Sequence, residues 1–199
     1  MSTRPTLSTL IVGASALIMM AAPDAFAFDN LSVIGDAPTA SCAQAASVAA
    51  EKGTASRDDL MLCNGAIHEA RNEPQSSQAA AVLNRGVLHL ARAEYVAAVA
   101  DFTAALRIQG DLSQAFVDRG LAYAAQHQFD QAVADFTKAL DLKPALPAKI
   151  YFDRAMANED KGDARSAYLD YLKAAQLDPA WDGPKAELKR FTVIHAGMS

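Results

Sequence analysis

Three similar segments follow one another in this chain, and this repetition restricts the possible folds more than any other feature. The copies begin at Val82, Phe116 and Tyr151, so successive copies are 34 and 35 residues apart. A repeat of this length holds one supersecondary unit that cannot bury its apolar face alone, so neighbouring units stack and share a core. The sequence therefore predicts an array of stacked repeats.

The repeated units are expected to be helical. The 199 residues include only ten glycines and eight prolines, and no segment alternates strictly between apolar and polar residues as a half-buried strand does. The predicted fold class is therefore all-α.

Residues of fixed type recur at fixed positions within each copy. The second copy has aromatic, small and aromatic residues in its first half and small, aromatic, small and proline residues in its second: Phe116, Gly120, Tyr123, Ala132, Phe136, Ala139 and Pro144. This pattern resembles the tetratricopeptide repeat (TPR) family, whose unit is a 34-residue helix–turn–helix. The resemblance implies a right-handed superhelical solenoid of about three repeats, at residues 79–112, 113–146 and 148–181.

The spacing also predicts contacts inside each hairpin. Small residues let two helices approach closely, and an aromatic residue in the second helix fills the space opposite, as in Gly86 with Phe102. An arginine and an aspartate recur sixteen residues apart, as Arg85–Asp101, Arg119–Asp135 and Arg154–Asp170. These positions lie near each other in an antiparallel hairpin, so we expect three structural ion pairs. The alternative is a ladder of arginines that binds a ligand.

Residues 1–27 are typical of a secretory signal peptide. Arg4 gives a positive start, Leu7–Ala22 is apolar, and Ala25-Phe26-Ala27 places small residues where a signal peptidase recognises them. The alternative is a membrane anchor, but a membrane span needs about 20 apolar residues, and this stretch ends earlier. We expect cleavage after Ala27, an extended N-terminal arm over residues 28–40, and a periplasmic or secreted protein without membrane insertion.

A helical hairpin is predicted over residues 41–72, before the first repeat. Gly53 suits the end of its first helix, and Ser56 can cap its second. The only two cysteines, Cys42 and Cys63, lie on opposing helices at similar distances from the turn. An even number of cysteines in an exported chain favours a disulfide, and their spacing fits neither a CxxC redox motif nor a zinc site.

A capping helix is predicted over residues 182–192, with Asp182 as its N-cap. Trp181, Pro184, Leu188 and Phe191 are spaced by three, four and three residues and so share one helix face. This face is expected to cover the last repeat. The alternative role for Trp181 is stacking against a ligand.

Composition and motifs exclude several classes of protein. A net charge of −5 without a basic run lacks the electrostatic footprint of a nucleic-acid binder. None of the four histidines belongs to a metal-binding motif, and no nucleophile elbow or glycine-rich phosphate loop occurs. We therefore expect no catalytic residues, no metal, no cofactor and no enzyme activity.

The TPR resemblance implies that the first helices of the repeats line a concave groove that binds a partner. The residues at the groove-facing positions are Leu83, Val87 and Leu90 in the first repeat, Gln114, Val117 and Leu121 in the second, and Lys149, Phe152 and Met156 in the third. Chaperone-binding TPR domains hold a carboxylate with lysine and asparagine at such positions, and that clamp is absent here. We therefore expect an apolar trough that holds an apolar or amphipathic segment.

The predicted function is protein–protein interaction, as an adaptor or assembly factor in the periplasm with a protein or peptide partner. One alternative is a structural repeat protein whose trough is filled by its own residues 28–40. Another is a regulatory subunit of an envelope enzyme. Fold alone does not separate these hypotheses.

Overall fold

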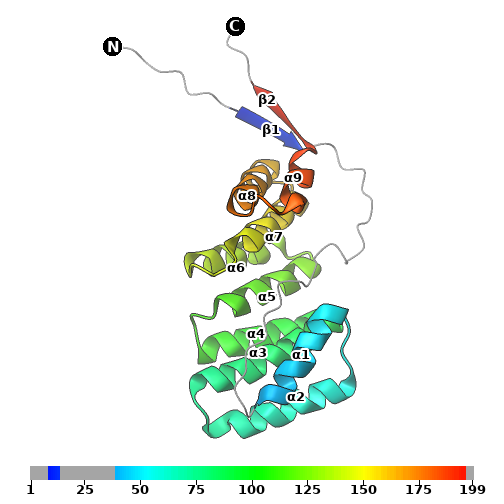
Figure 1. Ribbon diagram of the computed structural model, residues 1–199, viewed down its shortest axis with the longest axis vertical. Helices are drawn as coiled ribbons and strands as arrows, with labels where there is room; N and C mark the ends of the chain where they lie inside the picture. Colours follow the sequence, from blue (N-terminus) through cyan, green and yellow to red (C-terminus); the bar gives the residue numbers. More distant parts are fainter. Residues whose placement is uncertain (1–8, 14–38, 196–199) are drawn as a thin grey trace, which may run out of the picture. The chain divides into compact units, whose positions relative to one another are not determined.

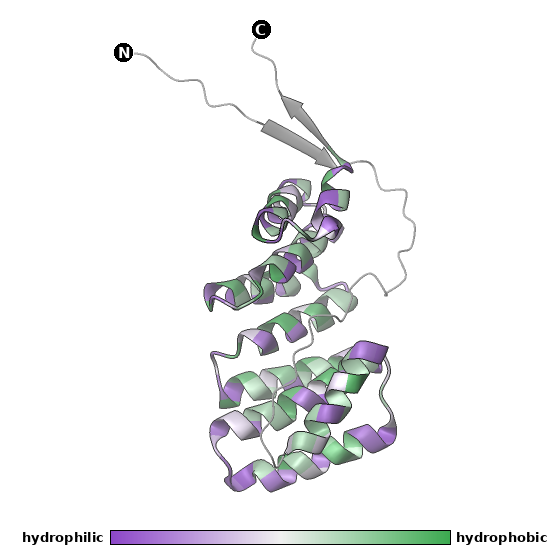
Figure 2. Ribbon diagram, viewed as in Figure 1, coloured by the Kyte–Doolittle hydropathy of each residue, from purple (hydrophilic) through white to green (hydrophobic). Residues whose placement is uncertain are grey.

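Antiparallel helical hairpins follow one another along the chain (Figure 1). The computed structural model describes residues 9–13 and 39–195. The chain divides into two units, one of residues 22–145 and one that combines residues 1–21 with 146–199. The all-α prediction is confirmed for the repeats, and hydrophobic and hydrophilic residues alternate around their helices (Figure 2).

The first unit contains three hairpins. The N-terminal hairpin consists of α1 (Ala40–Lys52) and α2 (Arg57–Glu69), followed by a short 3-10 helix (Ala70–Asn72). The next two hairpins are α3 (Gln75–Ala91) with α4 (Tyr95–Ile108), and α5 (Ser113–Ala125) with α6 (Phe129–Asp141). Each hairpin packs against the next, with α1 and α2 against α3, and α4 against α5.

The second unit contains α7 (Pro147–Asp160), α8 (Ala164–Leu177) and α9 (Asp182–Leu188). Two short strands, β1 (Thr9–Gly13) and β2 (Phe191–His195), pair antiparallel, with Gly13 opposite Phe191. The predicted capping helix is therefore too long: it ends at Leu188, and Phe191 belongs to a strand. Its N-cap is Trp181 rather than Asp182, which is the first helical residue.

The turn inside each hairpin has one repeated geometry. Ala93, His127 and Gly162 occupy equivalent positions with φ of 57°, 58° and 90°, in the left-handed region. The amide of the residue that follows each of them donates to a carbonyl five residues before it, at 2.8–2.9 Å. Left-handed backbone is unfavourable for a residue with a Cβ, so glycine fits this position best, and of these three turns only the one at Gly162 has it.

Gly86 and Gly120 allow the helices of their hairpins to approach closely. A Cβ added at Gly86 would lie 2.6 Å from the ring of Phe102, and one at Gly120 would lie 2.8 Å from that of Phe136. Both rings are fully buried. The glycines are therefore required by packing, not by backbone conformation.

The ends of the N-terminal hairpin follow the local signals. Gly53 has a φ of 65° at the end of α1, and the Ser56 hydroxyl accepts from the Asp59 amide to form a capping box at the start of α2. Two predicted boundaries are wrong. Residue 40, assigned to the arm, begins α1, and α3 begins at Gln75, four residues before the predicted start of the first repeat, because Pro74 takes the N-cap position.

The rest of the arm and the predicted signal cleavage site lie outside the described residues, and β1 is the described part of the predicted signal segment. No helix in the described ranges has both the length and the apolar character that crossing a membrane requires.

Candidate functional site

The repeated arginines meet the repeated aspartates in all three hairpins. In each case the guanidinium donates two hydrogen bonds to one carboxylate, at 2.7–2.8 Å. The hydrogen bond to Asp101 raises the pKa of Arg85, and the one to Asp135 raises that of Arg119. Two parallel charge-assisted hydrogen bonds fix both position and orientation of the guanidinium plane.

Two of these arginines also reach the preceding hairpin. Arg85 donates from Nη1 to Oδ1 of Asn64 on α2 at 2.8 Å, and Arg119 donates from Nη1 to Oγ1 of Thr103 on α4 at 3.0 Å. Each arginine thus joins three helices. This use of the donors favours a structural role over an arginine ladder that binds a ligand.

The predicted trough residues of the first unit are covered in the structure. Leu83, Val87, Leu90, Val117 and Leu121 are all buried, with Leu121 only 1% exposed. Helix α3 packs against α1, α2 and α4, and eleven of its 17 residues are buried, far more than one apolar stripe would bury. These side chains are therefore covered and do not form an open apolar surface.

Two polar side chains are buried among these apolar ones. Asn84 and Asp118 are 0% exposed. Each lies two residues before the glycine (Gly86 or Gly120) that faces the second helix of its hairpin. Two residues turn an α-helix by about 200°, so Asn84 and Asp118 lie on the opposite side of α3 and α5 from that partner helix. The side chain of Gln114, half-buried one turn earlier, donates to Asp118 Oδ1 at 2.7 Å. We call the sides of α3 and α5 that carry Asn84 and Asp118 the inner face.

The predicted groove residues of the third repeat lie in an aromatic cluster of the second unit. Phe152 is half-buried, with its ring 5.3 Å from that of Tyr171 and 4.8 Å from that of Trp181, measured between centroids. Met156 packs against the same cluster, and Lys149 is half-buried. Trp181 therefore packs on the repeat, as expected of a capping residue.

A buried hydroxyl closes this aromatic cluster. Tyr171 donates to Glu159 at 3.1 Å, and burial, followed by the charge of Glu159, raises the pKa of Tyr171. Arg190 pairs with both Glu159 and Glu187. These contacts tie α9 and its flanks to the third hairpin.

The described ranges contain no cluster of metal-ligating side chains. No group of three or more histidine, cysteine or acidic side chains there could hold a metal ion. His89, at an aromatic position of the repeat, lies 2.6 Å from Glu94 through Nδ1. The hydrogen bond with His89, followed by that from Arg92, lowers the pKa of Glu94. This cluster joins the end of α3 to the start of α4.

The cysteines lie in the core of the N-terminal hairpin. Cys42 and Cys63 form a disulfide with a Cα–Cα distance of 4.6 Å, and both are fully buried. Cys42 Sγ also lies 3.9 Å from the carbonyl oxygen of Ala81 on α3. The disulfide therefore fixes α2 to α1 where α1 packs on the first repeat.

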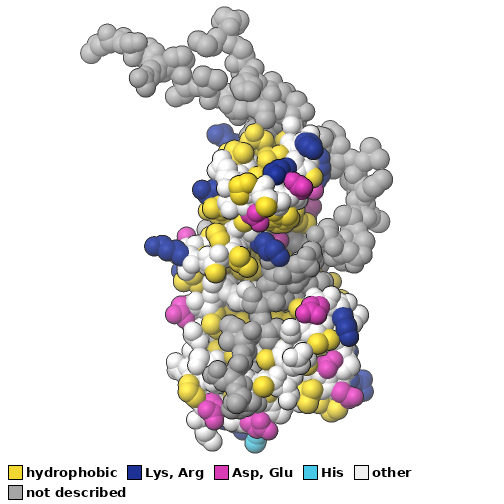
Figure 3. Space-filling view, viewed as in Figure 1, with side chains coloured by type: hydrophobic (Ala, Val, Ile, Leu, Met, Phe, Trp, Pro, Cys, Tyr) yellow, Lys and Arg dark blue, Asp and Glu magenta, His cyan; other side chains and the backbone are white. Residues whose placement is uncertain are grey.

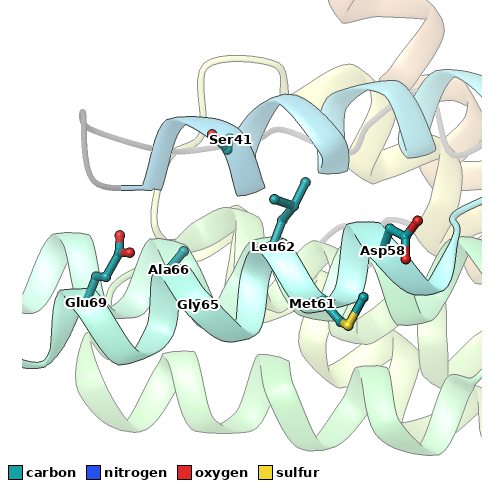
Figure 4. A pocket seen from close by; sticks show the side chains of 7 residues that line it. All are labelled: Ser41, Asp58, Met61, Leu62, Gly65, Ala66 and Glu69. Carbon is teal, nitrogen blue, oxygen red and sulfur yellow. The ribbon is translucent and has the colours of Figure 1, made fainter.

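A shallow pocket between α1 and α2 was not foreseen from the sequence. It has a volume of about 470 Å³ and is lined by Ser41, Asp58, Met61, Leu62, Gly65, Ala66 and Glu69. Figure 4 shows Leu62 and Glu69 pointing from α2 toward α1, where Ser41 lies. The available signal was the pair Met61-Leu62 next to a core cysteine, since neighbouring residues on a helix point about 100° apart and three in a row span a wide part of its circumference.

Gly65 in this pocket differs from the glycines of the repeats. It lies inside α2, and a Cβ added there would meet no atom within 4 Å. Glycine within a helix costs about 1 kcal/mol relative to alanine. No contact inside the described structure explains that cost.

Family comparisons identify the repeats. Residues 113–146 match a family model described as "Tetratricopeptide repeat", and residues 148–180 match a second model with the same description. No curated protein matches the chain.

Two solved structures with similar folds contain helical repeats of this kind. One is the second TPR domain of the human RPAP3 protein, determined by NMR in complex with the HSP70 peptide SGPTIEEVD; identity is 22%, the match covers 55% of this chain and 90% of that one, and the TM-score is 0.52. The other is the MamA RS-1 ArsTM double mutant, with 15% identity, coverage of 78% and 83%, and a TM-score of 0.62. At these identities the likeness concerns the fold alone.

Proposed function

Because this chain belongs to the tetratricopeptide repeat family, we propose that it is a non-catalytic protein-interaction module whose inner face holds an extended apolar segment. TPR repeats serve as interaction scaffolds, and the RPAP3 domain of similar fold was solved with a peptide bound.

One observation carries the proposal: the inner face is buried. Asp118 lies on the side of α5 turned away from α6, and both it and the neighbouring Leu121 are covered. A carboxylate is costly to bury, and Asp118 is buried beside apolar side chains with a hydrogen bond from Gln114, so the inner face is a covered apolar surface with a polar centre. Apolar residues around a few polar groups are typical of ligand-binding sites.

The same observation favours a second candidate, in which the occupant is this chain's own residues 28–38. These residues end directly before Thr39, which is fully buried at the start of α1. Cys42, three residues later, contacts Ala81 on α3, so the segment joins the described fold at a helix that packs on α3. Eleven residues span up to about 36 Å when extended, long enough to cross both α3 and α5.

Export from the cytoplasm is the remaining part of the proposal. The signal-like residues 1–27 support it, and so does a disulfide between the only two cysteines, because such bonds persist in oxidising compartments. We propose the periplasm as the compartment, with an adaptor or assembly role.

A deletion of residues 28–38, combined with a synthetic peptide of the same sequence, tests both candidates. If the chain fills its own inner face, the deletion lowers the melting temperature, and the added peptide binds and restores it. If the face is reserved for a partner, the deletion leaves melting unchanged, and an unrelated apolar peptide binds both proteins equally.

Leu121→Glu tests whether the inner face binds the peptide, whichever candidate is right. It should abolish peptide binding, while far-ultraviolet circular dichroism retains the helical signal. Val96→Glu is the matched control, because Val96 is 76% exposed on α4. Failure of every peptide to bind the deletion variant, together with unchanged melting, would show that the inner face is ordinary core.

A further inference from the structure

The pocket between α1 and α2 is separate from the inner face and has its own chemistry. Met61 is 58% exposed and Leu62 is 48% exposed, and they are the only sequence neighbours among the large apolar side chains exposed in the described ranges. Asp58, Leu62, Gly65 and Glu69 are spaced by four, three and four residues, so they share one face of α2. An apolar centre thus lies between two carboxylates, about 16 Å apart along the helix.

The pocket is held rigidly. Cys63, next to Leu62, is bonded to Cys42 on α1, and Ser41 beside Cys42 lines the opposite wall. The capping box of Ser56 and Asp59 fixes the start of α2. A preformed surface loses little conformational entropy when a partner binds, which favours recognition.

Gly65 indicates how closely a partner approaches. Gly86 and Gly120 each make room for a ring inside the fold, whereas the space beside Gly65 is empty. Gly65 and Ala66 together form a low stretch between Leu62 and Glu69. Small residues at a helix surface allow the backbone of a second helix to come near. Gly65 therefore leaves open space at the surface of α2, into which the backbone of a second helix fits.

The charges distinguish between possible occupants. A second copy of the same face would bring Asp58 and Glu69 against their own equivalents, and like charges in close contact are destabilising. Residues 28–38 contain two aspartates and neither lysine nor arginine, so they do not complement the pocket either. On the face in Figure 3, acidic and basic side chains both border hydrophobic ones over α1 and α2, and the acidic Asp58 and Glu69 are the charged residues that line the pocket.

We propose that the α1–α2 pocket docks an amphipathic helix of a partner protein, with an apolar stripe between two basic side chains about three turns apart. Leu62 and Met61 contact the stripe, the partner backbone passes over Gly65, and Asp58 and Glu69 pair with the basic side chains. This surface is independent of the inner face, so the chain has two interaction sites.

Two synthetic 18-residue helical peptides test the proposal. Both carry leucine and alanine on one face; one has lysine at two positions eleven residues apart, and the other has glutamate there. Fluorescence anisotropy with the purified chain should show that the lysine peptide binds at least about tenfold more tightly than the glutamate peptide. Equal affinity for the two peptides would overturn the proposal, as would no measurable binding of the lysine peptide.

Variants of the pocket sharpen the test. Leu62→Asp and Gly65→Gln should each weaken binding of the lysine peptide about tenfold, and Val96→Asp should not. The open space around Gly65 accepts the larger side chain, so Gly65→Gln should keep or raise the melting temperature while binding falls. Unchanged binding by Gly65→Gln would contradict the close approach of a helix.

A charge reversal separates this site from a nonspecific apolar patch. The double variant Asp58→Lys/Glu69→Lys should prefer the glutamate peptide. Sedimentation equilibrium tests whether a second copy of the chain occupies the pocket. Self-association that Leu62→Asp abolishes would show this and would overturn the proposal.

Discussion

The ring of Phe102 lies directly against Gly86, so closely that a Cβ at this glycine would be 2.6 Å away. The ring is fully buried and cannot move aside without disturbing the core. Gly86→Ala should therefore destabilise the protein by about 1–3 kcal/mol through overpacking. Gly65→Ala is the matched control and should stabilise by about 0.5–1 kcal/mol, because only helix propensity changes. Urea unfolding measures both, and losses of similar size would contradict this explanation.

Removing one partner of an arginine–aspartate pair should cost more than removing both. Arg119→Ala leaves Asp135 largely buried without its bidentate donor, and we expect a loss of about 2–3 kcal/mol. The double variant Arg119→Ala/Asp135→Ala should lose less than the sum of the single losses. Arg119→Lys should not restore stability, because lysine cannot form the two parallel hydrogen bonds. Additive losses in a double-mutant cycle would rule out direct coupling.

The disulfide should contribute strongly to stability. Its cysteines are 21 residues apart, and closing a loop of that length stabilises the fold by about 3 kcal/mol through the entropy of the unfolded chain. Cys42→Ser/Cys63→Ser should therefore melt at a lower temperature, and so should the reduced wild-type protein. If the oxidised and reduced proteins melt together, the hairpin does not depend on this bond.

The left-handed turn position offers a reciprocal pair of substitutions. Ala93 has a φ of 57° and Gly162 has a φ of 90° at the same place in the repeat. Ala93→Gly should raise the free energy of unfolding, and Gly162→Ala should lower it, by about 1 kcal/mol each. Chemical denaturation decides the sign, and a destabilising Ala93→Gly would show that the backbone is not strained there.

Acid should weaken the capping box of α2. Hydrogen bonds from the Ser56 hydroxyl and then from the Ser56 amide lower the pKa of Asp59. Because the pKa of Asp59 is lower in the folded state than the unfolded-state pKa of about 3.9, its ionised form stabilises the fold at pH values above that unfolded-state pKa. This contribution is lost as the pH falls through the folded-state pKa. Carboxylates titrate between about pH 5 and pH 2, so over this range the wild type should lose more stability than Asp59→Asn. The difference should be below about 1 kcal/mol, because the site is near the surface. Parallel stability curves for the two proteins would contradict it.

The sequence by itself determined the repeat, its helical hairpins and the residues that meet inside each one. Gly86 and Phe102, or Arg119 and Asp135, are only sixteen residues apart, and a helix–turn–helix of fixed length brings them together whatever surrounds it. The cysteine pair could be placed for the same reason, because both residues lie in one hairpin.

Only the tertiary structure decided which helix faces are covered. Leu83, Val117 and Leu121 have the spacing of a groove, but the structure shows that they are buried, and helical periodicity carries no information about what covers a helix face. The α1–α2 pocket has the same origin. Met61, Leu62 and Gly65 are local neighbours in sequence, yet their exposure depends on which side of α2 packs against α1 and α3.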